Sequence, residues 1–269
     1  MESKIFEILG RFESVSLTDL NARAAMLERL DNKYIVSADR LCHALNAFAQ
    51  GFDVLEIDGR RTFTYATRYF DDDNLQSYYN HHQGRRKRCK VRVRDYVDAG
   101  FTFLEVKLKD KRKITVKRRL KVDGALDRLD GTCIDFVERS HRELYDEPLA
   151  LTLRQVISMR YDRVTLVAKE GGERMTIDTN LRFAANGITR AIPDDLFIIE
   201  TKSARGNGIA DRILRGLQLH PTAHCSKYCI GLAALGQVER RNRFLPALKR
   251  LQLIAAPPTI THSETRAAA

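Results

Sequence analysis

Three consecutive segments in the middle of the chain alternate between polar and apolar residues. In residues 88–95 the basic side chains fall on one face and the apolar ones on the other, and residues 101–109 and 113–121 continue the pattern. A period of two places alternate side chains on opposite faces of a β-strand. A turn at residues 98–100 joins the first two segments, which therefore predict a hairpin, and only Arg118 interrupts the alternation of the third.

Apolar residues at strand or helical spacing predict further elements on either side of this region. Strands are expected at residues 33–36, 52–57, 63–70, 151–168, 175–183 and 194–202, and helices at residues 4–11, 41–48, 72–82, 135–145, 209–219, 227–235 and 241–253. No convincing linker interrupts them, which favours one domain over residues 1–256 with a core at about 23–235. Residues 257–269 are expected to form a disordered tail.

The positive charge of the chain is concentrated in the alternating region. Lys and Arg number 46 against 35 Asp and Glu, but residues 85–121 hold sixteen basic side chains against four acidic ones, so the rest is nearly neutral. Such a block predicts one strongly positive site for a polyanion, with a solvated basic face as the alternative. Rows of Arg and Lys on neighbouring strands repel one another unless counter-charges or bound anions lie among them, so we expect a partner rich in phosphate or carboxylate.

The fold class expected from these patterns is α+β. About eight antiparallel strands can close into a barrel with basic side chains along its lumen, while helices from both ends of the chain cover the apolar faces from outside. A linear phosphate chain would fit such a tunnel. The alternative is an open sheet with a solvated basic face and a helical layer behind it.

Composition narrows the class of protein. No apolar run approaches the ~20 residues that a membrane-spanning helix requires, and no secretory signal is recognisable, so we expect a cytoplasmic protein without a membrane span. The five cysteines are scattered and form no CxxC pair, which disfavours disulfides and a zinc site. The chain has no tryptophan and its basic strands lack interleaved aromatic residues, so no nucleic-acid partner is expected.

An acidic residue precedes a lysine by two positions in three predicted strands. The pairs are Asp31 with Lys33, Glu105 with Lys107, and Glu200 with Lys202. On a strand both members share a face, so the carboxylate can hold a divalent metal while the lysine holds a phosphate oxygen, as phosphoryl transfer requires. A same-face ion pair is the alternative. Glu200 and Glu105 are the expected metal ligands.

Several short motifs occur in order along the chain. They are Lys33-Tyr34, Tyr65-x-Thr67-x-Tyr69-Phe70-Asp71, Lys90-Val91-Arg92-x-Arg94-x-Tyr96, Leu104-Glu105-x-Lys107, Lys117-x-Arg119, Glu200-x-Lys202 and Ser226-Lys227-Tyr228. Their order and spacing resemble the catalytic domain of the vacuolar transporter chaperone (VTC) family over about residues 23–235. That family belongs to the triphosphate tunnel metalloenzymes, within the CYTH-like superfamily, so the resemblance implies a tunnel-shaped antiparallel barrel.

The resemblance also implies a function and a set of site residues. The implied enzyme is a polyphosphate polymerase that transfers the γ-phosphate of ATP onto a growing inorganic polyphosphate chain with a divalent ion, Mn²⁺ or Mg²⁺. The implied phosphate-binding residues are Lys33, Arg92, Arg94, Lys107, Lys117, Arg119, Arg163, Lys202, Ser226 and Lys227. The implied catalytic residues are Lys33, Arg92, Arg94, Lys107, Lys117, Lys227 and the metal-binding Glu200. Ser226 is also expected to cap a helix whose N-terminus attracts anions.

Other functions stay open at this point. Water in place of the phosphate-chain acceptor would make the protein a hydrolase of inorganic triphosphate or nucleoside triphosphates, and a non-catalytic polyanion-binding module is a third possibility. A nucleotide base would bind at the rim of the tunnel, with Tyr69, Tyr78 and Tyr79 as candidates for stacking. His81 and His82 are expected at the surface or the tunnel mouth. The sequence leaves the oligomeric state open.

Overall fold

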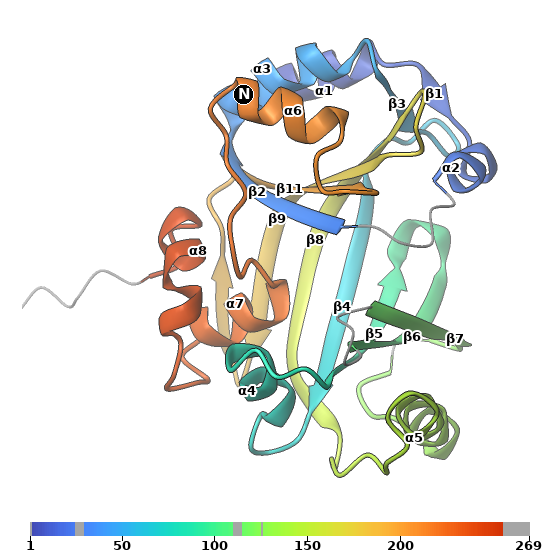
Figure 1. Cartoon of the computed structure of the whole chain (residues 1–269), viewed down its shortest axis with the longest axis vertical. Coiled ribbons are helices and arrows are strands. Elements are labelled where there is room, and N and C mark those ends of the chain that lie inside the picture. Colours follow the sequence, from blue (N-terminus) through green and yellow to red (C-terminus); the bar gives the residue numbers. More distant parts are fainter. Residues whose placement is uncertain (1, 25–29, 110–114, 125, 255–269) are drawn as a thin grey trace, which may run out of the picture.

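The computed structural model describes residues 2–24, 30–109, 115–124 and 126–254, whose helices surround one large sheet (Figure 1). The helices are α1 (Glu2–Gly10), α2 (Leu17–Arg23), α3 (Ala38–Phe48), α4 (Gln76–His82), α5 (Gly131–Tyr145), α6 (Ile209–Gly216), α7 (Lys227–Ala234) and α8 (Leu245–Arg250), with 3₁₀ turns η1 (Val97–Ala99) and η2 (Asn242–Phe244). The strands are β1 (Ser14–Val15), β2 (Leu30–Ser37), β3 (Phe52–Leu55), β4 (Phe63–Asp71), β5 (Arg88–Tyr96), β6 (Phe101–Lys109), β7 (Thr115–Val122), β8 (Arg154–Ala168), β9 (Arg174–Ala185), β10 (Ile188–Ala191) and β11 (Leu196–Ser203). The predicted strand residues 113–114 and the predicted tail at 257–269 lie outside the described residues.

The main path of the sheet contains eight strands in the order β2-β11-β9-β8-β4-β5-β6-β7, all antiparallel. β10 pairs with β9, β3 pairs with β8, and β1 adds a short parallel pair to β3. The sheet curves, with β2 and β11 crossing over one end of the long strands and β5 to β7 turned out of their plane (Figure 1). The predicted α+β class and tunnel-like antiparallel sheet are confirmed, but within the described ranges no ladder joins β2 to β7, so the sheet is open and not a closed barrel.

The outer face of β5, β6 and β7 is packed under helix α5. Leu104 and Val106 of β6 are fully buried together with Val137 of the helix. Arg118, the residue that interrupts the alternation, lies on this side opposite Val106 and forms an ion pair of 2.9 Å with Glu143 of α5. The irregular position in the sequence pattern therefore adds an ion pair between the sheet and its covering helix.

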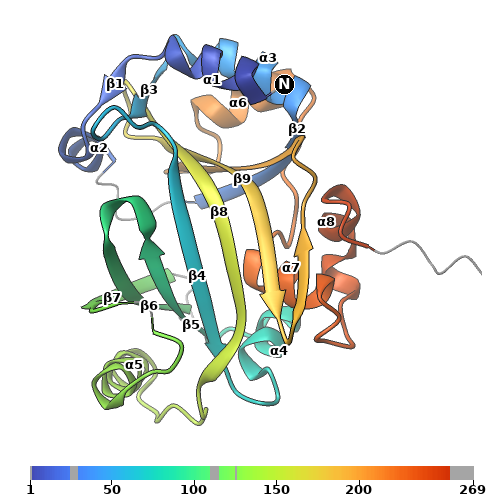
Figure 2. The same ribbon diagram turned by 180° about the vertical axis from the view of Figure 1, so that it is seen from behind.

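Helices α1, α3 and α6 cover the outer face at the other end of the sheet (Figure 2). Leu41, Leu45 and Phe48 of α3 are fully buried, in one cluster with Phe197 and Ile199 of β11. Apolar residues spaced by three or four positions form one face of a helix, which is the face that α3 buries. Covering of the outer face by helices, as predicted, is confirmed at this end.

Helix α7 departs from the prediction, because it packs against the inner, concave face of the sheet (Figure 1). A Cβ added to Gly231 would lie 2.5 Å from the ring of Phe183 on β9 and 2.6 Å from Ile157 on β8. All residues from 228 to 233 are buried. The helix therefore fills part of the concave space, and its first residues lie beside the part that stays polar.

Two further departures from the prediction concern the helix expected at 241–253 and the turn at Asn186 and Gly187. The helix expected at 241–253 is divided into η2 and α8, because Pro246 stands in the first turn of α8 and proline fits only the start of a helix. The turn at Asn186 and Gly187, with φ of 49° and 76°, leads into the additional strand β10. Positive φ at two adjacent residues is the geometry of a tight hairpin turn. The five cysteines are free and buried, which agrees with the prediction of reduced thiols.

We predict that Gly231→Ala destabilises the fold, because the new methyl group meets the buried side chains of Phe183 and Ile157, which have no free space to move into. Overpacking of this kind costs about 1–3 kcal/mol in the free energy of unfolding. Gly216→Ala, in the last turn of α6 with nothing within 4 Å, is the matched control and should be neutral or stabilise by up to about 1 kcal/mol. Urea denaturation of both variants measures the difference, and equal stabilities would contradict the packing of α7.

Candidate phosphate-binding tunnel

The inner face of β5, β6 and β7 carries basic side chains in register. Two rows across the three strands are Arg92–Glu105–Arg119 and Lys90–Lys107–Lys117. Neighbouring rows are two residues apart, roughly 6.6 Å along a strand. The predicted alternation is therefore confirmed in these strands, and one row consists of three lysines. Like charges directly opposite one another destabilise a sheet unless something compensates them.

The first compensating carboxylate is that of Glu105, which is only 1% exposed. Its Oε2 accepts hydrogen bonds from Arg92, with 2.7 Å to Nε and 2.6 Å to Nη2. Lys117 forms an ion pair with Oε1, and Nη1 of Arg94 lies 3.9 Å from Oε2. Burial by itself would raise the pKa of Glu105, but the three cations outweigh burial and hold that pKa well below its usual range. We call these four residues the Glu105 cluster.

Two further carboxylates, Asp31 on β2 and Glu200 on β11, form a second cluster with two lysines. Lys33 Nζ is 3.4 Å from Glu200 Oε2, and Lys202 contacts Glu200 Oε1 and lies 3.2 Å from Asp31 Oδ2. Because Glu200 pairs with Lys33 and Lys202 with Asp31 across the two strands, the charges alternate in sign. Burial would raise the pKa of Glu200, but Lys33 and Lys202 hold it well below its usual range. These four residues form the Glu200 cluster.

The third cluster is built around Asp178 on β9, whose side chain is fully buried. Arg163 on β8 donates two hydrogen bonds to it, from Nε to Oδ1 at 2.5 Å and from Nη2 to Oδ2 at 2.8 Å, and Lys227 at the start of α7 also donates to Oδ2. Burial would raise the pKa of Asp178, but Arg163 and Lys227 lower it to about 2. Asp178 is not among the predicted site residues. Met175 and Ile177 point to the outer face, so the period of two places Asp178 on the inner face.

The pKa of Lys107 is influenced by charged residues near the opposite edge of the open sheet. Its pKa is lowered to about 8, first because the surrounding protein desolvates the ammonium group and also because Lys33 and Lys202 lie near, while Glu200 and Asp31 oppose this. Lys107 is on β6, whereas Lys33 and Glu200 are on β2 and β11, near the opposite edge of the sheet. The side chain is nevertheless exposed to solvent. An exposed side chain whose ammonium group is nevertheless desolvated is consistent with a position on the concave face of the curved sheet.

The N-terminus of α7 lies on one side of this concave face. Ser226 occupies the N-cap position but its side chain caps no helical N–H, contrary to the prediction; its Oγ instead accepts a hydrogen bond of 2.9 Å from Lys90 Nζ. The next residue, Lys227, belongs to the Asp178 cluster of Asp178, Arg163 and Lys227. Tyr228 donates a hydrogen bond to the buried Asp71 at the end of β4. Sheet and helix are thus joined by polar contacts at the site.

The inner face therefore has more basic than acidic groups. Lys90, Lys107 and Arg119 form no ion pair with a carboxylate of the described residues. With them, the three clusters comprise ten basic side chains and four carboxylates: Lys33, Lys90, Arg92, Arg94, Lys107, Lys117, Arg119, Arg163, Lys202 and Lys227 against Asp31, Glu105, Asp178 and Glu200. All predicted site residues lie on this face or at the start of α7, and the surplus of positive charge is available to an anion.

The carboxylates of the inner face are the candidate ligands for a divalent ion. In the part of the chain that the structure describes, no group of three or more His, Cys, Asp and Glu side chains could hold a metal. Asp31 and Glu200 lie on either side of the Lys202 ammonium group and are partly accessible. Mg²⁺ and Mn²⁺ prefer oxygen ligands, and Mg²⁺ is commonly held by one or two carboxylates together with phosphate oxygens. These carboxylates fit an ion shared with a phosphate substrate, whereas Glu105 is only 1% exposed.

Two of the tyrosines predicted to stack on a base are buried, and the two neighbouring histidines contact other side chains. Tyr69 is buried under Arg92, whose Nη1 donates a hydrogen bond of 3.0 Å to the phenol oxygen, and Tyr78 is fully buried. His82 contacts Asn242 at 2.8 Å, and His81 stacks on Phe244. Burial lowers the pKa of His81 to about 2, helped by Lys90 and Arg88, so His81 is neutral beside the basic rows.

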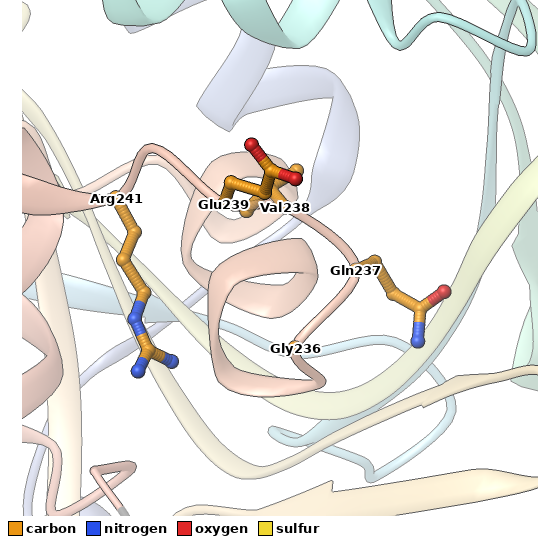
Figure 3. Close-up of a pocket in the computed structure, with 5 residues that line it drawn as sticks. All are labelled: Gly236, Gln237, Val238, Glu239 and Arg241. Carbon is orange, nitrogen blue, oxygen red and sulfur yellow. The ribbon is translucent and has the colours of Figure 1, made fainter.

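A surface pocket of about 380 Å³ lies away from these clusters. It is lined by Gly236, Gln237, Val238, Glu239 and Arg241 in the segment that follows α7. The side chains of Gln237 and Arg241 point in different directions from this loop (Figure 3). None of the residues that line it belongs to the three clusters, so this pocket is separate from the candidate site.

The chain is similar to known proteins in structure and in sequence. Among solved structures, the chain is similar to the putative adenylyl cyclase HpAC1 from Hippeastrum, described as having a dominant triphosphatase activity (12% identity, TM-score 0.46, covering 81% of this chain and 100% of that one). It is also similar to the PH1012 protein from Pyrococcus horikoshii OT3 (12% identity, TM-score 0.40, covering 71% and 91%). The search of curated proteins found no match. The sequence matches the VTC domain over residues 28–236, most of the chain, and the protein therefore belongs to the VTC domain family.

Proposed function

We propose that the protein is a metal-dependent polyphosphate polymerase that transfers the γ-phosphate of ATP onto a growing inorganic polyphosphate chain. Membership of the VTC domain family links the chain to polyphosphate and triphosphate chemistry. The observation that supports the proposal most directly is the convergence of three ion-pair clusters on one concave, solvent-accessible face with more cations than carboxylates. A linear polyanion is the ligand that neutralises such a surface along its length.

The carboxylates of the site would orient the cations rather than bind substrate. Asp178 engages Arg163 through both of its oxygens, and a bidentate pair fixes the plane of a guanidinium group. Glu105 Oε2 contacts both Nε and Nη2 of Arg92, and Lys117 contacts the other oxygen of Glu105. Preorganised donors stabilise developing charge without the cost of reorganising during the reaction. Arg92 and Lys227 would then stabilise charge on the transferred phosphoryl group, and Arg94 would hold the phosphates that precede it.

Glu200 and Asp31 would hold the divalent ion, for which Mn²⁺ or Mg²⁺ is proposed. When bound, the ion would neutralise negative charge on the phosphates. Lys33 and Lys202 lie at the two oxygens of Glu200, where their ammonium groups would bind phosphate beside that carboxylate. Glu105 remains a predicted second ligand, and its contacts support the positioning of Arg92 more directly.

The substrates proposed are ATP and inorganic polyphosphate. None of the described helices combines the length and apolar character needed to cross a bilayer. A cytoplasmic location, where ATP is abundant, is part of the proposal.

The defining experiment incubates the purified protein with ATP and Mn²⁺ or Mg²⁺, with and without a short polyphosphate primer, and resolves the products on a gel while ADP and free phosphate are measured. Long polymer formed together with one ADP per phosphate added supports the polymerase. Free phosphate without polymer would replace the proposal with triphosphate hydrolysis. Binding of polyphosphate without any turnover would replace it with a polyanion-binding module.

We predict that Glu200→Gln abolishes turnover and keeps substrate binding. Metal assistance is worth several kcal/mol, so we expect a loss of about 100-fold or more in kcat. Affinity for inorganic tripolyphosphate in EDTA should stay the same or increase, because the variant removes a negative charge from the site. Glu170→Gln, an exposed carboxylate in the turn between β8 and β9, is the matched control and should behave as wild type. Full activity of Glu200→Gln would contradict the metal assignment.

The affinity for tripolyphosphate should fall as the pH rises from 7 to 9. Desolvation lowers the pKa of both Lys107 and Lys117 to about 8, so the two ammonium groups are charged below this pH and lose their protons above it. Neutral amines attract phosphate weakly. Titration calorimetry in EDTA, where no metal contributes, measures the decline. The double variant Lys107→Arg/Lys117→Arg stays charged throughout this range and should show a flatter profile; an unchanged decline in the double variant would assign it to other groups.

A further inference from the structure

The wall formed by β5, β6 and β7 changes in character along its length. Toward the β5–β6 turn, the next row is Arg94–Phe103–Lys121, which still holds two basic residues, and the last row pairs Tyr96 with Phe101. The side chains of these rows share the inner face with Arg92 and Glu105, because they follow at intervals of two residues. One end of the wall is therefore aromatic and the other is basic.

The three rings at this end contact one another directly. Tyr96 and Phe101 have ring centroids 4.7 Å apart, and Phe101 and Phe103 are 5.6 Å apart in an edge-to-face arrangement. Each of the three side chains is only partly buried, in contrast to the enclosed rings of Tyr69 and Tyr78. We call Tyr96, Phe101 and Phe103 the aromatic rim. It offers apolar ring surface to solvent at the end of a phosphate-binding face.

Arg119 connects the aromatic rim to the basic rows. Its guanidinium carbon lies 4.9 Å from the ring centroid of Phe103, within the range of a cation–π contact. The residue belongs to the row of Arg92 and Glu105, makes no ion pair with a described carboxylate, and is exposed. A cation that is stacked on an aromatic ring and lacks a counter-charge suits the junction between a ring and a phosphate group.

From this arrangement we propose that the aromatic rim binds the base of a nucleoside triphosphate whose phosphates extend along the basic rows toward Lys107. The proposal rests on the proposed function, since it identifies where the phosphate donor is held. A ligand complementary to the wall needs an aromatic head and a linear anionic tail. Lys107 follows Phe103 by four positions, which is roughly 13 Å along a strand. This length is comparable to the reach of an extended nucleoside triphosphate from its base to its terminal phosphate. Lys107 in turn lies in the row of three lysines with Lys90 and Lys117.

The orientation has a chemical consequence. With the base at the aromatic rim, the γ-phosphate lies farthest from the β5–β6 turn, beside the row of Lys90, Lys107 and Lys117. The bond between the β- and γ-phosphates would break there, the nucleoside diphosphate would keep the electron pair of the bridging oxygen, and the terminal oxygen of the phosphate chain would form the new bond to phosphorus. The nucleoside diphosphate would leave from the aromatic end and the lengthened chain would remain with the basic rows.

The test compares a triphosphate that has a base with one that lacks it. Affinities for ATP and for inorganic tripolyphosphate are measured by calorimetry in EDTA for wild type, Phe103→Leu and Phe101→Leu. Phe136→Leu on α5, partly buried on the outer face of the sheet, is the matched control. Stacking of a base on an aromatic ring contributes enough that we expect at least about a fivefold loss of ATP affinity in the rim variants. Tripolyphosphate affinity should stay within about twofold, and Phe136→Leu should change neither.

Each outcome bears on a definite part of the proposal. Loss of ATP affinity alone supports the aromatic rim as the base site. An equal loss for both ligands, or no loss for either, would overturn it while leaving the phosphate-binding tunnel intact. If wild type binds neither ligand but circular dichroism shows it folded, the proposed function itself fails and the base site with it. Phe103→Leu and Phe101→Leu keep apolar side chains, and a thermal melt of each variant identifies any that fails to fold, leaving the other to decide.

Discussion

Electrostatic repulsion among the cations of the inner face is the constraint on which the rest of the structure depends. Rows of lysine and arginine on neighbouring strands would force the sheet apart, and three buried or nearly buried carboxylates prevent this by each holding two or more cations. The same contacts keep the carboxylates ionised, because the cations lower the pKa of Glu105, Asp178 and Glu200. The balance is incomplete, and the excess of cations is what makes the face a site for polyanions.

Because the strands are pleated, the same alternation that places the cations on the inner face also places apolar side chains in the core. Alternation directs the cations inward and Leu104, Val106 and their neighbours outward, where α5 buries them. A single register therefore satisfies both requirements, and a slip by one residue would bury the charges. Arg118 is tolerated on the apolar side because Glu143 of α5 neutralises it. The rigidity of the site thus derives from apolar packing behind it rather than from the ion pairs alone.

Sequence alone was sufficient for the parts of the fold that depend on local alternation. The strands at 88–96 and 101–109, their hairpin and the basic inner face followed from a period of two, and the VTC resemblance placed Lys33 and Glu200 on the same face. Contacts between distant segments were not accessible in this way. Asp178 is separated by 49 residues from Lys227, and no spacing rule relates them. Helix α7 is apolar on all sides, so its pattern did not indicate which face of the sheet it would cover.

A β-bulge explains how the inner face combines a polar part with an apolar one. Between the pairs Arg163–Asp178 and Met159–Phe183 the strand β9 uses one residue more than β8, and Asn180, with φ of 53°, lies in this irregularity. The extra residue reverses the alternation, so Asp178 and Phe183 point to the same side although an odd number of positions separates them. Gly231 of α7 packs against Phe183. The same helix begins at Lys227, which therefore lies next to Asp178. The packing of the helix and the charge pairing of the site are consequences of one inserted residue.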